Sequence, residues 1–159
     1  MICLLLLTPL VAQATANHKY GADEYDTIMQ GISPDGKWAI TTHGDGDYGY
    51  DDFHVYLTNN VTGKKVGPME EIVGTLDTGA NAFCAQWSAD STQVTIVYRI
   101  SRHKPLKVMS YRIGQGRAFP MTKAPVDGND DWQGYWADYG STAGPSPKVF
   151  GEPSPHSGY

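Results

Sequence analysis

A ten-residue unit occurs twice in this chain, and the duplication restricts the available folds more than any other feature. The segment SPDGKWAITT at residues 33–42 is matched by SADSTQVTIV at residues 88–97, an offset of 55 residues. The match begins just before the turn, where Ile32 is equivalent to Trp87. Self-similarity at a fixed spacing is typical of architectures that repeat one structural unit.

Each copy has the pattern of a strand, a tight turn and a second strand. After the turn, apolar and polar residues alternate with a period of two, which is the pattern of a half-buried strand. A third strand and a glycine turn follow in each copy, and helical periodicity is absent from residues 20–123. We therefore expect an all-β fold with two four-stranded antiparallel units, residues 24–75 and 81–123, inside a region spanning residues 17–126.

The two copies resemble the TolB-type β-propeller repeat. The residues that carry the resemblance are ISPDGKWAITT with FHVYLTNNVTGKKV in the first copy, and QWSADSTQVTIVY with LKVMSYRIGQGRAF in the second. In that family each repeat is a four-stranded blade, and the blades surround a central channel. The second copy departs from the motif at Ala89 and Ser91. The resemblance covers residues 24–123 and implies a platform for protein interaction.

Two blades are too few for a closed ring, because propellers have about four to eight. Three arrangements are consistent with the sequence. The chain is a fragment or remnant of a longer propeller, or an open two-blade sheet covered by its own C-terminal segment. In the third arrangement, several copies complete a ring between them.

The N-terminal residues of the chain indicate export. Residues 1–16, MICLLLLTPLVAQATA, contain a short apolar run followed by small residues, which is the pattern of a secretory signal peptide. We expect a periplasmic protein if the source is bacterial and an extracellular one otherwise, with no stable membrane span. Removal of this segment leaves Cys84 as the only cysteine, which we expect to be buried.

Charge divides the two repeats. Residues 17–80 carry four lysines and eleven acidic residues, a net charge of −7, whereas residues 81–126 carry seven basic residues and one aspartate, a net charge of +6. Opposite charges attract, so we expect the repeats to meet within one molecule or between copies. The basic stretch is a candidate interaction surface, with Arg99, Arg102, Lys104 and Lys107. Export and the overall negative charge argue against nucleic acid as a partner.

The C-terminal region divides into an aromatic segment, residues 127–140, and a tail, residues 141–159. Four aromatic residues lie at helical spacing and would share one face, as a cover for the sheet or as a ligand platform: Trp132, Tyr135, Trp136 and Tyr139. Asn129 or Asp130 would cap this helix and Gly140 would end it. A degenerate third repeat is the alternative. The tail is rich in serine, proline and glycine and is expected to be disordered.

The acidic loop at residues 43–54 is a candidate cation site. It contains four carboxylates between His43 and His54, namely Asp45, Asp47, Asp51 and Asp52. Calcium prefers such oxygen ligands, although the spacing does not match an EF-hand. Calcium is therefore the cofactor that the carboxylates of this loop suggest. If the loop joins two strands, the two histidines would face one another, and a transition-metal ion between them is the alternative.

Motifs of the common enzyme classes are missing, including the G-x-S-x-G elbow, H-E-x-x-H and the phosphate loop. We therefore expect an exported, non-enzymatic binding or assembly module that acts through protein–protein interaction or self-association. One alternative is a small-ligand or cation-binding protein that uses the acidic loop or the aromatic segment. The other is a remnant of a larger propeller enzyme.

Overall fold

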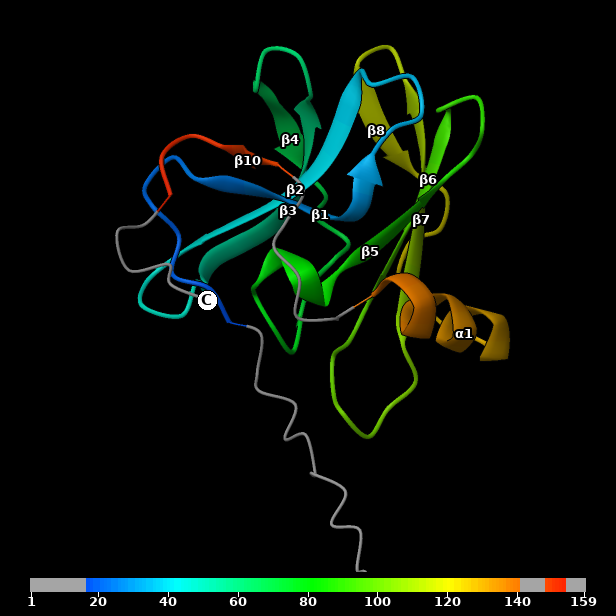
Figure 1. Cartoon of the computed structure of the whole chain (residues 1–159). Helices are drawn as coiled ribbons and strands as arrows, with labels where there is room; N and C mark the ends of the chain where they lie inside the picture. Colours follow the sequence, from blue (N-terminus) through cyan, green and yellow to red (C-terminus); the bar gives the residue numbers. More distant parts are fainter. Residues whose placement is uncertain (1–16, 141–147, 154–159) are drawn as a thin grey trace, which may run out of the picture.

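The computed structural model describes residues 17–140 and 148–153, so the predicted signal peptide lies outside the described residues. Strands dominate this part of the chain (Figure 1). The first half contains β1 (Tyr25–Ile32), β2 (Trp38–Asp45), β3 (Asp51–Asn59) and β4 (Lys65–Pro68). The second half contains the 3-10 helix η1 (Ala80–Ala82), β5 (Cys84–Trp87), β6 (Gln93–Tyr98), β7 (Lys107–Gly114) and β8 (Arg117–Pro120). The C-terminal elements are β9 (Val126–Asp127), α1 (Asp130–Tyr139) and β10 (Val149–Phe150).

One sheet runs through both halves in the order β4-β3-β2-β1-β5-β6-β7-β8. Consecutive strands within each half are antiparallel, whereas β1 and β5 meet as parallel neighbours, with Met29 opposite Cys84. The sheet curls into a nearly closed barrel with β4 and β8 at its ends (Figure 1). The predicted all-β fold class is therefore confirmed.

The main hydrophobic core is shared by both halves. Ile40 of β2 and Ile96 of β6 are fully buried in it, and Phe83 stacks between Phe53 and Tyr98. The period-two patterns after the two turns predicted these buried faces, because alternate side chains of a strand point to the same side of the sheet. One hydrophobic core therefore joins the two halves of the chain.

The first repeated turn is built by its own side chains. The Ser33 hydroxyl donates to the Asp35 carboxylate at 2.6 Å, and that carboxylate accepts from the Lys37 amide at 3.0 Å. The Trp38 amide donates to the Ser33 hydroxyl oxygen at 3.0 Å, which closes the turn. Gly36 adopts the left-handed conformation, with φ of 72°. Serine, aspartate and glycine therefore have the roles that the sequence predicts for them.

The second turn repeats this arrangement atom for atom. The Ser88 hydroxyl donates to the Asp90 carboxylate at 2.7 Å, which accepts from the Thr92 amide at 3.1 Å. The Gln93 amide donates to the Ser88 hydroxyl oxygen at 2.9 Å. Ser91 occupies the position of the glycine with φ of 60°, so the altered motif still forms the same turn. The internal repeat thus extends from the sequence to its hydrogen bonds.

The Gly36→Ala substitution measures how much the first turn depends on its left-handed residue. Nothing lies within 4 Å of an added Cβ, so its cost is conformational alone. We expect the free energy of unfolding to fall by about 1–2 kcal/mol, which is the left-handed penalty of an L-residue. Urea denaturation provides the measurement. An unchanged free energy of unfolding would show that the turn relaxes to another conformation.

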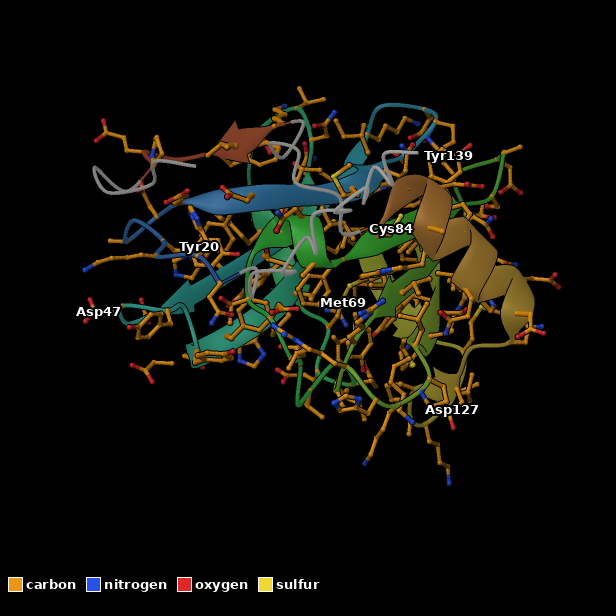
Figure 2. The ribbon with its side chains drawn as sticks, turned by 60° about the horizontal axis from the view of Figure 1, so that its bottom comes forward. Tyr20, Asp47, Met69, Cys84, Asp127 and Tyr139 are labelled. Carbon is orange, nitrogen blue, oxygen red and sulfur yellow. The ribbon has the colours of Figure 1, made fainter. Side chains whose placement is uncertain are left out.

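The aromatic segment folds as α1, which rules out a degenerate third repeat. The Asn129 side chain accepts from the Trp132 amide, and the Gly140 amide closes the last turn on the Trp136 carbonyl. α1 packs on the second half, over a small apolar cluster that includes Cys84 (Figure 2). Among the described residues, no helix is long and apolar enough to cross a membrane.

The C-terminal tail contributes a strand to the sheet. β10 pairs antiparallel with β1, with Tyr25 opposite Phe150, and the Lys148 ammonium donates to the Asn60 carbonyl at 2.6 Å. The expectation of disorder is therefore wrong for residues 148–153, because β1 has unpaired backbone groups that β10 satisfies. The rest of the tail lies outside the described residues. With α1 on the second half and β10 on the first, the structure favours a two-unit sheet covered by its own C-terminal segment.

The two ends of the sheet are short strands. β4 and β8 have four residues each, and they finish at Pro68 and Pro120. Short edges that carry proline discourage pairing with another chain. The ends of the sheet are therefore protected against edge-to-edge association.

Candidate functional site

The four aspartates of the acidic loop do not converge on one point. Asp45, Asp47, Asp51 and Asp52 are all exposed around the β2–β3 connection. Asp47 accepts a hydrogen bond from Lys19 at 2.6 Å, which holds the pKa of this carboxyl below its usual range. Within the part of the chain that the structure describes, the one convergent group of metal-ligating side chains lies elsewhere. The geometry therefore gives no support to a calcium site in this loop.

The two histidines at the ends of the loop face one another, as the strand arrangement predicts. His43 and His54 are opposite residues in the β2–β3 ladder. They have different partners, however: His43 Nδ1 donates to the Glu24 carbonyl at 2.6 Å, whereas His54 Nε2 lies 3.2 Å from Asp52 Oδ1. His43 is buried and His54 is half-buried, and their different partners do not form a shared metal centre.

A row of aromatic rings crosses the first half on the side of the sheet where these histidines lie. Tyr25 stacks on His43 at 4.4 Å and meets Tyr56 edge-on at 5.1 Å, and His54 meets Tyr56 at 5.9 Å. We call these four residues the tyrosine–histidine face. Burial raises the pKa of Tyr56 to about 12, so its phenol stays neutral and able to donate hydrogen bonds. All members but His43 remain partly exposed.

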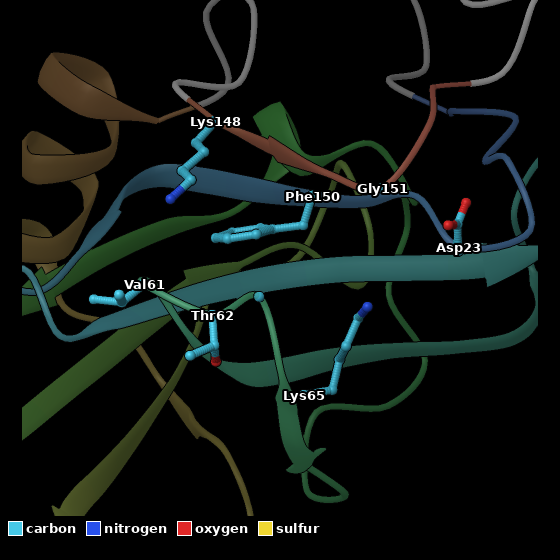
Figure 3. A pocket seen from close by; sticks show the side chains of 8 residues that line it. Asp23, Val61, Thr62, Lys65, Lys148, Phe150 and Gly151 are labelled. Carbon is cyan, nitrogen blue, oxygen red and sulfur yellow. The ribbon is translucent and has the colours of Figure 1, made fainter.

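An open pocket of about 380 Å³ adjoins this face (Figure 3). Phe150 and Lys148, at β10, lie across the pocket from Thr62 and Lys65, at the turn before β4 and in β4 itself (Figure 3). The volume is within the range of about 300–1,000 Å³ that is common for ligand sites. We call this the lysine pocket; it is lined by Asp23, Val61, Thr62, Gly63, Lys65, Lys148, Phe150 and Gly151.

The two lysines of the pocket contact different groups. Lys148 donates to the carbonyl and to the side-chain oxygen of Asn60, at 2.6 and 3.0 Å. Lys65 lies over the Tyr25 ring, with Nζ 3.9 Å from the ring centre, and makes no ion pair with the described residues. Lys65 therefore joins the pocket to the tyrosine–histidine face and offers a positive charge to an incoming group.

The aromatic side chains of α1 are mostly used in packing. Trp136 is 6% exposed, Trp132 and Tyr135 are half-buried, and Tyr139 is 45% exposed. The Tyr135 hydroxyl donates to the Ala85 carbonyl at 2.7 Å, which ties the helix to β5. Three of the four rings face the protein, so the arrangement favours the covering role over a ligand platform.

The basic stretch is the loop between β6 and β7 together with its ends. Arg99 lies 5.5 Å from the Trp136 ring, and Lys107 forms a 2.6 Å ion pair with Asp127. Arg102 and Lys104 are exposed. The charges at the ends of the loop support α1 and β9, which leaves a smaller basic surface than the sequence predicts.

Cys84 is a buried residue of the sheet under α1, as expected. Burial raises the pKa of its thiol to about 11. Because the thiolate is the reactive form, this thiol is poorly suited to nucleophilic or redox chemistry.

Comparison with known protein families, characterised proteins and solved structures gives no match for this chain. The function must therefore be argued from the residues themselves. Sequence reasoning found the two histidines of the face but missed the lysine pocket. The pocket joins residues 61–65 to residues 148–151, and no local pattern links such distant segments.

Proposed function

We propose that the protein is a non-enzymatic binding module built from two TolB-like propeller blades, and that it acts through protein–protein interaction. The identical hydrogen-bond arrangement of the turns at Ser33 and Ser88 supports the duplication. The first strands of the two units, β1 and β5, are parallel neighbours in one sheet, so the two units are joined along these strands. Fold alone does not assign a function, so the proposed function rests on the binding surface.

The lysine pocket and the tyrosine–histidine face together are the proposed binding surface. The observation that carries this assignment is Lys65, a lysine between an open pocket and half-buried aromatic rings, with no carboxylate paired to it among the described residues. Aromatic residues are enriched in protein interfaces because they bury much area with little loss of entropy. The partner is accordingly a protein segment that presents a carboxylate to Lys65 and apolar atoms to Tyr25 and Tyr56.

The proposed setting of this module is outside the cytoplasm, in the periplasm of a bacterium or in the extracellular space. The apolar start and the small residues before Asn17 support that assignment.

Selection of peptides from a random display library tests the proposed surface. We expect the wild-type protein to enrich segments that combine acidic and apolar residues. Lys65→Glu should weaken binding of those segments at least tenfold, because it replaces attraction by repulsion. Lys123→Glu is the matched control, since Lys123 is exposed and lies outside the pocket.

Two results would contradict the proposal. One is enrichment of peptides that bind Lys65→Glu as tightly as wild type, which would place the binding surface elsewhere. The other is a library from which the wild-type protein enriches no acidic and apolar segment above background.

A further inference from the structure

A second cluster of chemically active side chains lies at the junction of the N-terminal segment with β1. His18, Glu24 and Asp26 are 7%, 1% and 2% exposed. His18 Nε2 lies 2.8 Å from Glu24 Oε1 and 3.6 Å from Asp26 Oδ2. One potential ligand atom from each residue lies within 4.8 Å of the others. This is the one such group within residues 17–140 and 148–153.

The cluster contains more negative charge than its single imidazole can balance. Two carboxyl groups share the site, and Asp26 Oδ1 has no hydrogen-bond partner among the described residues. A buried carboxylate without partners is costly, so native proteins pair such groups or use them to coordinate metals. A cation bound between the three side chains would balance the second carboxylate and give Asp26 Oδ1 a partner.

Surrounding groups hold the three side chains in place. The Gly21 amide donates to Glu24 Oε2 at 2.6 Å, which leaves Oε1 turned toward the histidine. The His18 amide donates to the Thr78 hydroxyl at 3.1 Å, and the Tyr20 ring meets the His18 ring edge-on at 4.6 Å. Outer contacts of this kind orient ligands in metal sites.

The distances suit a small divalent ion. A tetrahedral ion with ligands at about 2.0–2.1 Å separates neighbouring ligand atoms by about 3.3 Å. The two distances from His18 Nε2, 2.8 and 3.6 Å, lie on either side of that value. Imidazole together with carboxylate is a ligand set for zinc and related ions, whereas calcium prefers oxygen ligands alone.

We propose that His18, Glu24 and Asp26 bind one divalent transition-metal ion of the zinc class. His18 Nε2, Glu24 Oε1 and Asp26 Oδ2 are the three protein ligands, and a water molecule that donates to the unpartnered Asp26 Oδ1 completes the coordination. All three side chains are buried, so we assign the ion a structural role. The ion joins the segment at residues 17–21 to β1, and so fixes one end of the first half.

Metal titration of the purified, chelator-treated protein tests this site. We expect one Zn²⁺ per chain and a melting temperature that rises by about 5–10 °C at a hundredfold excess over the dissociation constant. Co²⁺ is the second probe, since a four-coordinate site gives it intense visible absorption. Asp26→Asn and His18→Gln should each lower the Zn²⁺ affinity at least tenfold.

His54→Gln is the matched control, because His54 also lies near two carboxylates, Asp52 and Glu70, but on the surface. Its Zn²⁺ affinity should equal that of the wild type. The proposal is overturned if the wild-type protein shows neither a thermal shift nor a Co²⁺ spectrum, a result that needs no variant to fold. Equal affinity in wild type, Asp26→Asn and His18→Gln would also overturn it.

Discussion

Replacing Trp136 with alanine should lower the free energy of unfolding by about 3–5 kcal/mol, the usual cost of removing a large buried aromatic side chain. Trp136 is 6% exposed and packs with Cys84, Val97, Leu106 and Val108 under α1. Its removal leaves a cavity between the helix and the second half. Urea denaturation, followed by far-UV circular dichroism, measures the loss.

Thiol labelling gives this substitution a second and local readout. With the Cys84 pKa raised to about 11, labelling of the native protein at pH 8 should be on the order of a hundredfold slower than that of the unfolded chain. Trp136→Ala should accelerate it by uncovering β5. Tyr139→Ala is the control, since that ring is 45% exposed and its loss should change stability by less than about 1 kcal/mol. Equal effects of the two variants would show that α1 does not cover the sheet.

The Gly44→Ala substitution should cost about 3 kcal/mol, the upper end of the penalty for overpacking. Gly44 is buried in β2, where the register with β3 shifts. An added Cβ would overlap the carbonyl oxygen of Gly49 and lie 3.0 Å from the Phe53 ring. Backbone atoms cannot move aside as a flexible side chain can, so the β2–β3 hairpin must distort. Urea denaturation again measures the change.

Gly134→Ala is the matched control for that variant. Gly134 lies in the exposed part of α1, and nothing is within 4 Å of an added Cβ. Alanine is favoured over glycine in a helix, so this variant should be more stable than wild type by about 0.5–1 kcal/mol. An unchanged free energy of unfolding in Gly44→Ala would contradict the close contact between Gly44 and Gly49 in the β2–β3 hairpin.

Local signals in the sequence predicted the parts of the fold that depend on neighbouring residues. The duplicated turn was visible because Ser33 and Asp35 bond within their own segment, as do Ser88 and Asp90. The helix at residues 130–139 was visible from aromatic spacing and from its cap at Asn129. In both cases the stabilising contacts lie within a few residues of one another.

Contacts between distant segments could not be predicted in this way. β10 is a two-residue strand in a tail with a polar composition, and it forms because β1 provides backbone partners. The cluster at His18 depends on the turn at residues 21–24, which brings the histidine back to β1. One local signal did exist: Glu24 and Asp26 are two residues apart, so an extended chain places both on the same side.

Composition and burial point to different candidate cation sites. The loop at residues 43–54 has the greater density of acidic residues, but exposed carboxylates are stable in water without a metal ion. Asp47 pairs with Lys19, and its neighbours point to separate partners. The carboxylates of the buried cluster are shielded from water, so they need a partner that the exposed carboxylates of the loop do not need. This difference in burial favours the N-terminal cluster as the metal site.

The solution mass of the purified protein, measured by light scattering behind a sizing column at low and high salt, tests the central claim most directly. In the structure the two repeats share one core, α1 packs on the second repeat, and β10 pairs with β1 of the first. A self-contained two-unit module should therefore be a monomer at both salt concentrations. A discrete dimer, trimer or tetramer that dissociates in high salt would contradict this account. It would indicate a ring completed between copies by the opposite charges of the two repeats.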